Sequence, residues 1–248
     1  MGIENKGGYR LGARWGGNLT TGMSGRISVQ QYESDGYVDN DYLNRSDTNS
    51  GRADRAGTSL GARTHTEAAA YYTRVDNGYD AFSLDNTRAT LSDQPGEDDL
   101  TLKAGRLNWQ SGFLGLDSTL QLSHASTDTT YSYDEDWSYV GIAPGWEYSS
   151  YDEYLRDRSM NSLEWRLQAP EANGTEWVIG TYLRDESEDL SRRYTYLPAP
   201  FASEIDTQTL AFFGQLNRSF SEQLSGFIGA ARATRQRISR QRGASQRL

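Results

Sequence analysis

The chain has 248 residues, a formal net charge of −9, no cysteine and only two histidines, His65 and His124. No run of about 18 apolar residues occurs, which excludes a helical membrane span. The missing cysteines exclude a disulfide framework and a thiolate metal site, and two histidines are too few for the usual imidazole metal sites. The acidic balance argues against a nucleic-acid partner, because phosphate binding needs a basic face. Mean hydropathy is low at −0.78, yet 12% of the residues are aromatic, too many for a disordered chain.

Apolar and polar residues alternate with period two along most of the chain, which predicts β-strands. In the first segment Tyr9, Leu11, Trp15 and Leu19 fall on one face, and arginine, glycine and asparagine fall on the other. The same pattern recurs through the sequence, and helical spacing does not compete with it over any long stretch. We expect about ten strands, at 9–19, 22–33, 55–63, 67–76, 99–110, 113–131, 155–169, 175–190, 205–218 and 222–232. A slip of phase near Gly105 predicts a bulge within the fifth strand.

The connections between these strands alternate between short and long. Long polar links are expected at 33–54, 77–97, 132–154 and 190–204, with tight turns between them. A soluble sandwich has no reason to place all its long loops at one end, whereas a transmembrane β-barrel does. In such a barrel the apolar face meets lipid and the polar face turns inward, which explains the low mean hydropathy. The sequence therefore predicts an all-β, antiparallel, up-and-down transmembrane β-barrel.

The polar face and the length of the strands indicate a wide barrel. Arg10, Arg14, Arg26, Glu164 and Arg166 would crowd the interior of a small closed barrel, in which side chains must fill the lumen. The segment 113–133 is also roughly twice the 9 to 11 residues that a membrane-crossing strand needs. We therefore expect this chain to form part of a large barrel that projects beyond the bilayer.

Five segments carry a resemblance to a known family: Val75 to Thr87 (VDNGYDAFSLDNT), Thr90 to Gly96 (TLSDQPG), Tyr133 to Trp137 (YDEDW), Leu155 to Arg158 (LRDR) and Leu210 to Gln215 (LAFFGQ). They resemble segments of TonB-dependent outer-membrane receptors of the siderophore-receptor type. The resemblance is collinear over about residues 8 to 230. It implies a Gram-negative outer-membrane barrel of about 22 strands, closed by an N-terminal plug and driven by TonB. It also implies import of ferric siderophores or similar nutrients.

The departures from the family predict a barrel fragment. Nothing in the sequence corresponds to the family's signal peptide, TonB box or plug, and about ten strands cannot close the family's barrel. TonB would then act only through the missing plug, and the fragment would be inactive alone. We expect a partial barrel over 1–231. The basic segment 232–248 abandons the alternation and is expected to be an unstructured tail.

Aromatic residues concentrate in two of the long links and are the candidate ligand-binding residues. They would stack on a siderophore or a sugar, while nearby carboxylates could bind a cation. The alternative is an aromatic girdle at the membrane surface with solvated loop acids. The candidates are Tyr79, Phe82, Tyr133, Trp137, Tyr139, Trp146 and Tyr148.

Two classes of function remain open from the sequence. The first is an outer-membrane receptor, whose partners are lipid and a small ligand such as a ferric siderophore. The second is a soluble extracellular β-sandwich, either a carbohydrate-binding protein or a glycosidase with Asp134 and Asp136 as its carboxylate pair. No hydrolase or nucleotide motif stands in the required context, so we predict no catalytic residue, no metal and no cofactor.

Overall fold

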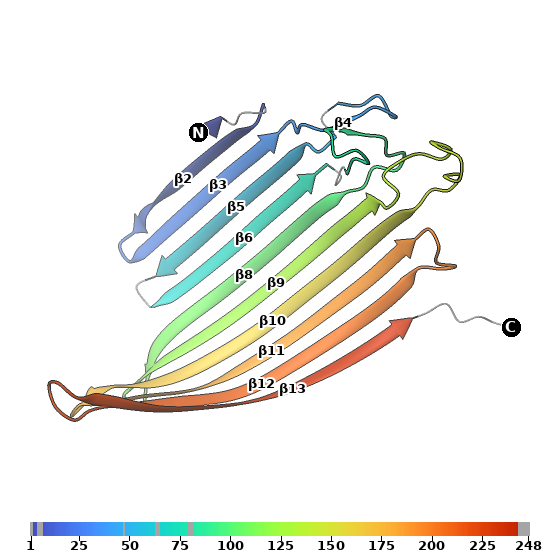
Figure 1. The fold of residues 1–248 in the computed structure, drawn as a ribbon. Coiled ribbons are helices and arrows are strands. Elements are labelled where there is room, and N and C mark those ends of the chain that lie inside the picture. Colours follow the sequence, from blue (N-terminus) through green and yellow to red (C-terminus); the bar gives the residue numbers. More distant parts are fainter. Residues whose placement is uncertain (1, 4–6, 47, 63–64, 79–81, 243–248) are drawn as a thin grey trace.

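The computed structural model describes residues 2–3, 7–46, 48–62, 65–78 and 82–242. Eleven strands form one antiparallel sheet in which each strand pairs with its neighbours along the chain (Figure 1). Two short strands, β4 and β7, pair with each other outside this sheet. Among the described residues no helix is long and apolar enough to cross a membrane. The sheet consists of β1 (Gly2–Ile3), β2 (Tyr9–Thr20), β3 (Met23–Ser34), β5 (Gly51–Ala62), β6 (Thr66–Asn77), β8 (Asp98–Phe113), β9 (Leu116–Asp134), β10 (Tyr151–Ala172), β11 (Thr175–Tyr194), β12 (Phe201–Ser219) and β13 (Ser225–Arg242).

The alternation of loop lengths predicted from the sequence is confirmed. The long connections 35–50, 78–97 and 135–150, together with 195–200, lie at one end of the sheet, which we call the loop end (Figure 1). The opposite turn end has tight connections. One of them is Asn173-Gly174, whose φ angles of 53° and 73° are those that a two-residue hairpin turn requires. Ten long strands and this up-and-down order match the predicted fold class.

The two faces of the sheet differ in composition. Because paired residues of antiparallel strands point to the same side, register assigns each side chain to a face. One row of the apolar face contains Leu107, Leu122, Leu163, Leu183 and Leu210, each paired with the next across the strands. The alternate residues form the polar face, which is rich in arginine, glutamate, serine and threonine.

Exposure is reversed relative to a water-soluble protein. On the apolar face Leu183 is 44% exposed and Phe212 is 58% exposed. On the polar face the side chains of Glu186 and Glu188 are only 16% and 20% exposed. Among the described residues the buried hydrophobic set is limited to Val38, Ala53 and Ala69. The sheet therefore has no conventional apolar core, and its apolar side chains point toward the surroundings.

The predicted bulge near Gly105 is wrong. β8 pairs with β6 and β9 without any shift of register at this residue. The phase slips in the sequence because Leu100 and Leu102 lie on the polar face, near the loop end, while Leu107 and Trp109 lie on the apolar face. The described shifts of register occur elsewhere, between residues 18 and 20 of β2 and between residues 169 and 172 of β10.

The basic segment at the C-terminal end also differs from the expectation. β13 continues to Arg242 and pairs in unbroken register with β12, from Ser219↔Ser225 to Ala202↔Arg242. Residues 232–242 are therefore strand and not an unstructured tail, and 243–248 lie outside the described residues. Sequence alternation failed here because arginine occupies both faces of β13, so backbone pairing with β12 specifies the strand.

We predict that amide hydrogen exchange will be slow along the second half of β13. The amides of 232–242 that bond to β12 should exchange roughly a hundredfold more slowly than unprotected amides, because exchange requires the strand to detach. Mass spectrometry of peptides from the intact protein measures this, with the same peptides in the denatured protein as the unprotected reference. Equal rates in the folded and the denatured protein would contradict the pairing.

Candidate functional site at the loop end

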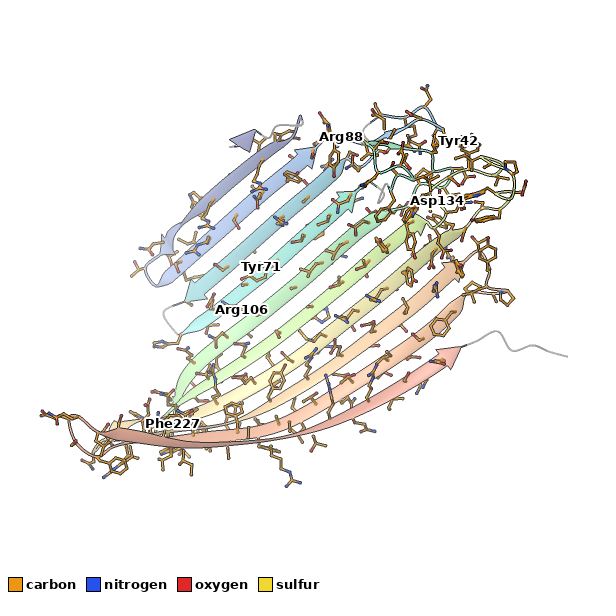
Figure 2. The ribbon with its side chains drawn as sticks, viewed as in Figure 1. Tyr42, Tyr71, Arg88, Arg106, Asp134 and Phe227 are labelled. Carbon is orange, nitrogen blue, oxygen red and sulfur yellow. The ribbon has the colours of Figure 1, made fainter. Side chains whose placement is uncertain are left out.

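Three long loops pack against one another at the loop end. We name them the first loop (35–50), the second loop (78–97) and the third loop (135–150). Figure 2 places Tyr42, Arg88 and Asp134 together at this end, far from Phe227 at the turn end. Because the three loops come from well-separated hairpins, their contacts are long-range in sequence.

Backbone pairing joins the first loop to the second. β4 (Asp39–Asn40) and β7 (Ala89–Thr90) form a short parallel ladder. The Asp39 amide donates to the Arg88 carbonyl at 2.9 Å. The Asn40 side chain is 1% exposed, and its Nδ2 donates to the Ser92 carbonyl at 2.8 Å. A buried amide that meets its partner inside the protein fixes the position of both loops.

Asp134, the last residue of β9, joins the second loop to the third. Its Oδ2 accepts a hydrogen bond from Ser92 Oγ at 2.6 Å, and its Oδ1 accepts from the amides of Asp136 and Trp137 at 3.1 and 3.2 Å. Asp134 is only 3% exposed. Burial raises the pKa of this carboxyl to about 6, the Ser92 hydrogen bond partly opposes the rise, and the charge of Asp136 adds to it.

Asp136 holds the third loop closed in the same way. Its Oδ1 accepts from the Ser138 amide and hydroxyl at 3.1 and 2.9 Å, and its Oδ2 accepts from the Ser150 amide at 2.7 Å. Aspartate commonly caps backbone amides two residues ahead in this manner. Both carboxylates of the Asp134/Asp136 pair therefore serve the backbone of the loop, which is a structural task and not the arrangement expected of a glycosidase pair.

Five of the predicted ligand-binding residues lie in stacked aromatic pairs that involve the loops. Phe82 stacks on Trp137 with ring centroids 5.0 Å apart and an interplanar angle of 27°. Tyr139 stacks on Tyr42, at 4.3 Å and 10°. These pairs bring the third loop against the second and the first. Trp146 and Tyr148 stack on each other within the third loop, at 6.0 Å and 21°.

Two predicted residues stand apart from these pairs. Tyr79 lies outside the described residues. Tyr133 lies on the polar face of β9, where its ring is tilted against Tyr131 at 5.7 Å and its hydroxyl lies 3.4 Å from Asp152 Oδ2. The predicted set therefore divides between the loops and the inner wall beneath them. Ligand binding by these residues stays a prediction.

Arg192 and Asp152 form a buried ion pair beside Tyr133 that sequence reasoning missed. Arg192 donates to both carboxylate oxygens of Asp152, at 2.9 and 2.6 Å, and lies over the rings of Tyr154 and Tyr194, at 5.2 and 4.9 Å. Burial alone would raise the pKa of Asp152, but the hydrogen bonds from Arg192 and Tyr154 outweigh it and lower the pKa. The two residues are 40 positions apart, so no local pattern could have paired them.

Two glycines allow backbone to pack on backbone beneath the loops. A Cβ placed on Gly96 would lie 1.8 Å from the Ser132 carbonyl oxygen, and one on Gly78 would lie 2.2 Å from the Thr48 carbonyl oxygen. Both distances are far below van der Waals contact. The second loop can therefore reach its place only because both of its ends carry glycine.

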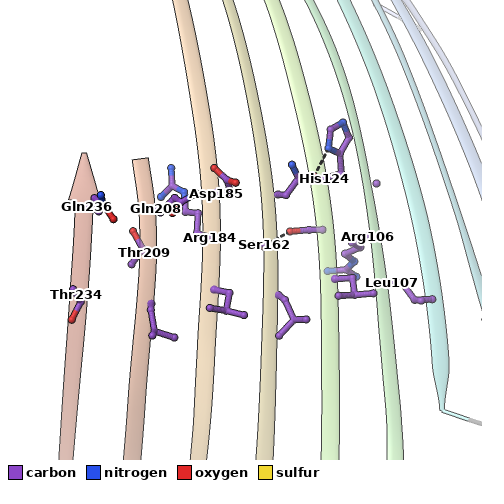
Figure 3. Close-up of a pocket in the computed structure, with 17 residues that line it drawn as sticks. Arg106, Leu107, His124, Ser162, Arg184, Asp185, Gln208, Thr209, Thr234 and Gln236 are labelled. Atoms are coloured by element: carbon purple, nitrogen blue, oxygen red, sulfur yellow. Dashed lines mark hydrogen bonds between the residues drawn. The ribbon is translucent and has the colours of Figure 1, made fainter. Parts of the chain in front are cut away.

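A groove of about 950 Å³ crosses the apolar face lower down (Figure 3). One side of it is the leucine row described above. The other side is the next row toward the loop end, which is polar and in which His124 Nδ1 lies 2.8 Å from Asn161 Oδ1. The groove thus follows the line where this face changes from apolar to polar. The polar row consists of His124, Asn161, Asp185, Gln208 and Gln236.

The fold is similar to solved structures of siderophore receptors. The ferric yersiniabactin uptake receptor FyuA from Yersinia pestis matches 96% of this chain and 42% of its own, with a TM-score of 0.72 and 13% identity. The structure of the FpvAI–pyocin S2 complex matches 95% of this chain and 37% of its own chain, with a TM-score of 0.71 and 14% identity. The siderophore receptor PiuA from Acinetobacter baumannii matches 96% of this chain and 45% of its own chain, with a TM-score of 0.57 and 9% identity. The class of fold is therefore that of the TonB-dependent siderophore-receptor barrel.

The similarity covers part of each of those proteins, because the chain spans less than half of their length. No protein-family model matches the sequence, and no curated protein matches it. At this level of identity the likeness establishes the fold alone. Within the described part of the chain, no group of three or more histidine, aspartate or glutamate side chains is placed to hold a metal ion.

We predict that the packing of the second and third loops weakens as pH rises through about 6. Because the folded pKa of Asp134 lies above the usual carboxyl value of 3.8, its effect is fully favourable at low pH and is lost as the buried group ionises. The difference corresponds to at most about 3 kcal/mol. The measurement is amide exchange at Asp136 and Trp137 from pH 4.5 to 7.5, corrected for intrinsic rates.

The matched variant is Asp134→Asn, which keeps the shape of the side chain and cannot ionise. The pH dependence should disappear in this variant. Asp93→Asn serves as the control, because burial also raises the pKa of Asp93, and this variant should keep the pH dependence that Asp134 causes. An unchanged pH dependence in Asp134→Asn would show that another group controls the packing.

We also predict that Gly96→Ala detaches the second loop from the end of β9. The added methyl group has no space beside the Ser132 carbonyl, so the packing should lose about 1 to 3 kcal/mol. Limited proteolysis within 78–97 should become faster. Gly112→Ala is the control, since nothing lies within 4 Å of a Cβ at that glycine. Equal cleavage of the two variants would contradict the predicted contact.

Proposed function

We propose that this chain is part of the barrel wall of a TonB-dependent outer-membrane receptor that imports ferric siderophores or similar scarce nutrients. The observation that carries the proposal is the reversed exposure of the sheet, with apolar side chains outward and charged side chains on the sheltered face. Lipid is the surrounding that makes such a surface favourable. The location that follows is the outer membrane of a Gram-negative bacterium.

The two levels of the apolar face support a membrane boundary. The leucine row gives way to the row of His124 and Asn161, and two rows further toward the loop end the same face carries Asp128 and Asp157, which are paired across β9 and β10. Acidic side chains are unfavourable in hydrocarbon and favourable in water. The strands therefore extend past the lipid on the side of the long loops, as expected for tall receptor barrels.

The soluble alternative has less support. A β-sandwich hides its apolar faces by stacking two sheets about 10 Å apart. Here all long strands belong to one sheet, and the other pairings among the described residues are the short β4–β7 ladder and a single bridge between Asn40 and Arg45. The fold neighbours are also receptors and not carbohydrate-active enzymes.

In this proposal the three packed loops are the surface that a ligand meets first. Phe82 and Trp137 stack on each other yet remain 43% and 37% exposed, so each pair still offers part of a ring face. Aromatic faces suit ligands with flat or sugar-like groups. TonB would act on a plug inside the barrel and not on this wall.

Single-cysteine labelling tests the proposed placement, because the chain has no cysteine of its own. In intact cells a membrane-impermeant maleimide should label Val140→Cys in the third loop. It should label Ser221→Cys at the turn end only after the outer membrane is permeabilised. Leu183→Cys should react with a lipid-soluble reagent and not with the impermeant one.

The matched control for the wall is Thr209→Cys on the polar face of β12, which should be reached from water. If Leu183→Cys is labelled by the impermeant reagent as fast as Val140→Cys in the folded protein, the apolar face meets water. That result would remove the membrane assignment.

A further inference from the structure

The polar face of β2, β3 and β5 carries arginines without acids. Arg14 of β2, Arg26 of β3 and Arg55 of β5 lie on this face, as the register with their neighbours shows. The face has no aspartate or glutamate on any of these three strands. A fourth arginine, Arg10, lies over the ring of Tyr32 at 5.4 Å. In a chain with a net charge of −9, this wall is a local region of positive charge.

The polar-face arginines of β8, β10 and β11 have acidic partners on the same face. Arg156 lies 3.2 Å from Glu188, and Arg158 and Arg184 pair with Glu188 and Glu186. Arg106 of β8 pairs with Glu67 of β6 at 2.8 Å. In each of these pairs an acid of the sheet itself balances the charge of the arginine.

Arg14, Arg26 and Arg55 have no acidic partner of this kind in the described sheet. None of the three forms an ion pair with any residue in the described ranges, and all three are exposed. Their charges are therefore available to a group from outside the sheet.

A hollow of about 870 Å³ lies beside two of these arginines. Arg14 and Arg26 line it, and glycine and serine keep its floor low. Glu67 also lines it, but is already paired with Arg106. Asn108 at its edge has a buried Oδ1 that finds no hydrogen-bond partner in the described part of the chain. The glycines and serines of the floor are Gly16, Gly17, Gly25, Gly61, Ser24 and Ser59.

The three arginines descend the wall in steps. Arg55 lies level with Gly12, Arg14 lies one step nearer the turn end, and Arg26 is level with Gly16, one step further. Each step is two residues, or about 7 Å along a strand. Guanidinium groups at this spacing can meet separate anionic groups of one molecule.

We propose that the polar face of β2, β3 and β5 is a binding surface for anions that carry several carboxylate or phosphate groups. The guanidinium fork matches both groups in a bidentate manner. A cluster of charges of one sign also raises the local concentration of counter-ions. The setting, the inner wall of a barrel, rests on the proposed function, whereas the arginine arrangement does not.

Arginine modification tests the proposal on the intact protein, purified in detergent as the cell makes it. Phenylglyoxal reacts with accessible guanidinium groups, and peptide mass spectrometry gives the rate at each arginine. Arg14, Arg26 and Arg55 should react faster than the ion-paired Arg158 and Arg184. Citrate should slow the reaction at the three unpaired arginines at least threefold and leave Arg88 of the second loop unchanged.

A second measurement uses variants with the same change of charge. Citrate binding by calorimetry should weaken at least tenfold in Arg14→Gln/Arg26→Gln. It should stay unchanged in Arg45→Gln/Arg88→Gln, whose arginines lie in the first and second loops. A hexaglutamate peptide forms a parallel arm. Protection by citrate indicates a small solute, and protection by the peptide alone indicates an acidic polypeptide as the natural occupant.

The proposal is overturned if neither anion slows modification of Arg14, Arg26 and Arg55, or if the two double variants bind the protecting anion equally. These outcomes are separate from the failure of the membrane assignment. Cysteine labelling could place the apolar face in water while the arginines still bind citrate, and it could confirm the barrel while they bind nothing.

Discussion

The structure depends on pairing every long strand with its neighbours while leaving the apolar face of the sheet exposed. Backbone hydrogen bonds run between adjacent strands from β2 to β13, so the peptide groups of the inner strands are satisfied without water. The side chains of each face then determine which solvent that face favours. Leucine, tryptophan and phenylalanine face outward, and arginine and glutamate pair on the sheltered side. In bulk water the same sheet would expose its apolar face at a large cost.

The loops depend on a different balance, because their order comes from buried polar groups and not from an apolar core. Asp134 and Asp136 each accept several hydrogen bonds from loop backbone and serine hydroxyls. Such networks are stable only when their members are satisfied. The aromatic pairs add contacts between loops, but the positions of the loops follow from the carboxylates and from the close backbone approaches at Gly78 and Gly96.

Period-two alternation and loop length were enough to predict the sheet and the order of its strands. They failed where one face changes character along a strand. In β8 the apolar residues Leu100 and Leu107 lie on opposite faces, which imitated a bulge, and in β13 arginine on both faces concealed a strand. The loop residues were found by composition alone. Their partners, such as Ser92 for Asp134 and Arg192 for Asp152, lie about 40 positions away and depend on register, which no local pattern reveals.

The short ladder between β4 and β7 makes the three loops a single mechanical body. Through it the first loop is tied to the second, and through Ser92 and Asp134 the second is tied to the third. A molecule that touches only one of them must therefore either leave all three in place or displace all three together. A molecule would therefore reach the space beneath the loops only when these contacts break together, and not through the separate opening of one loop.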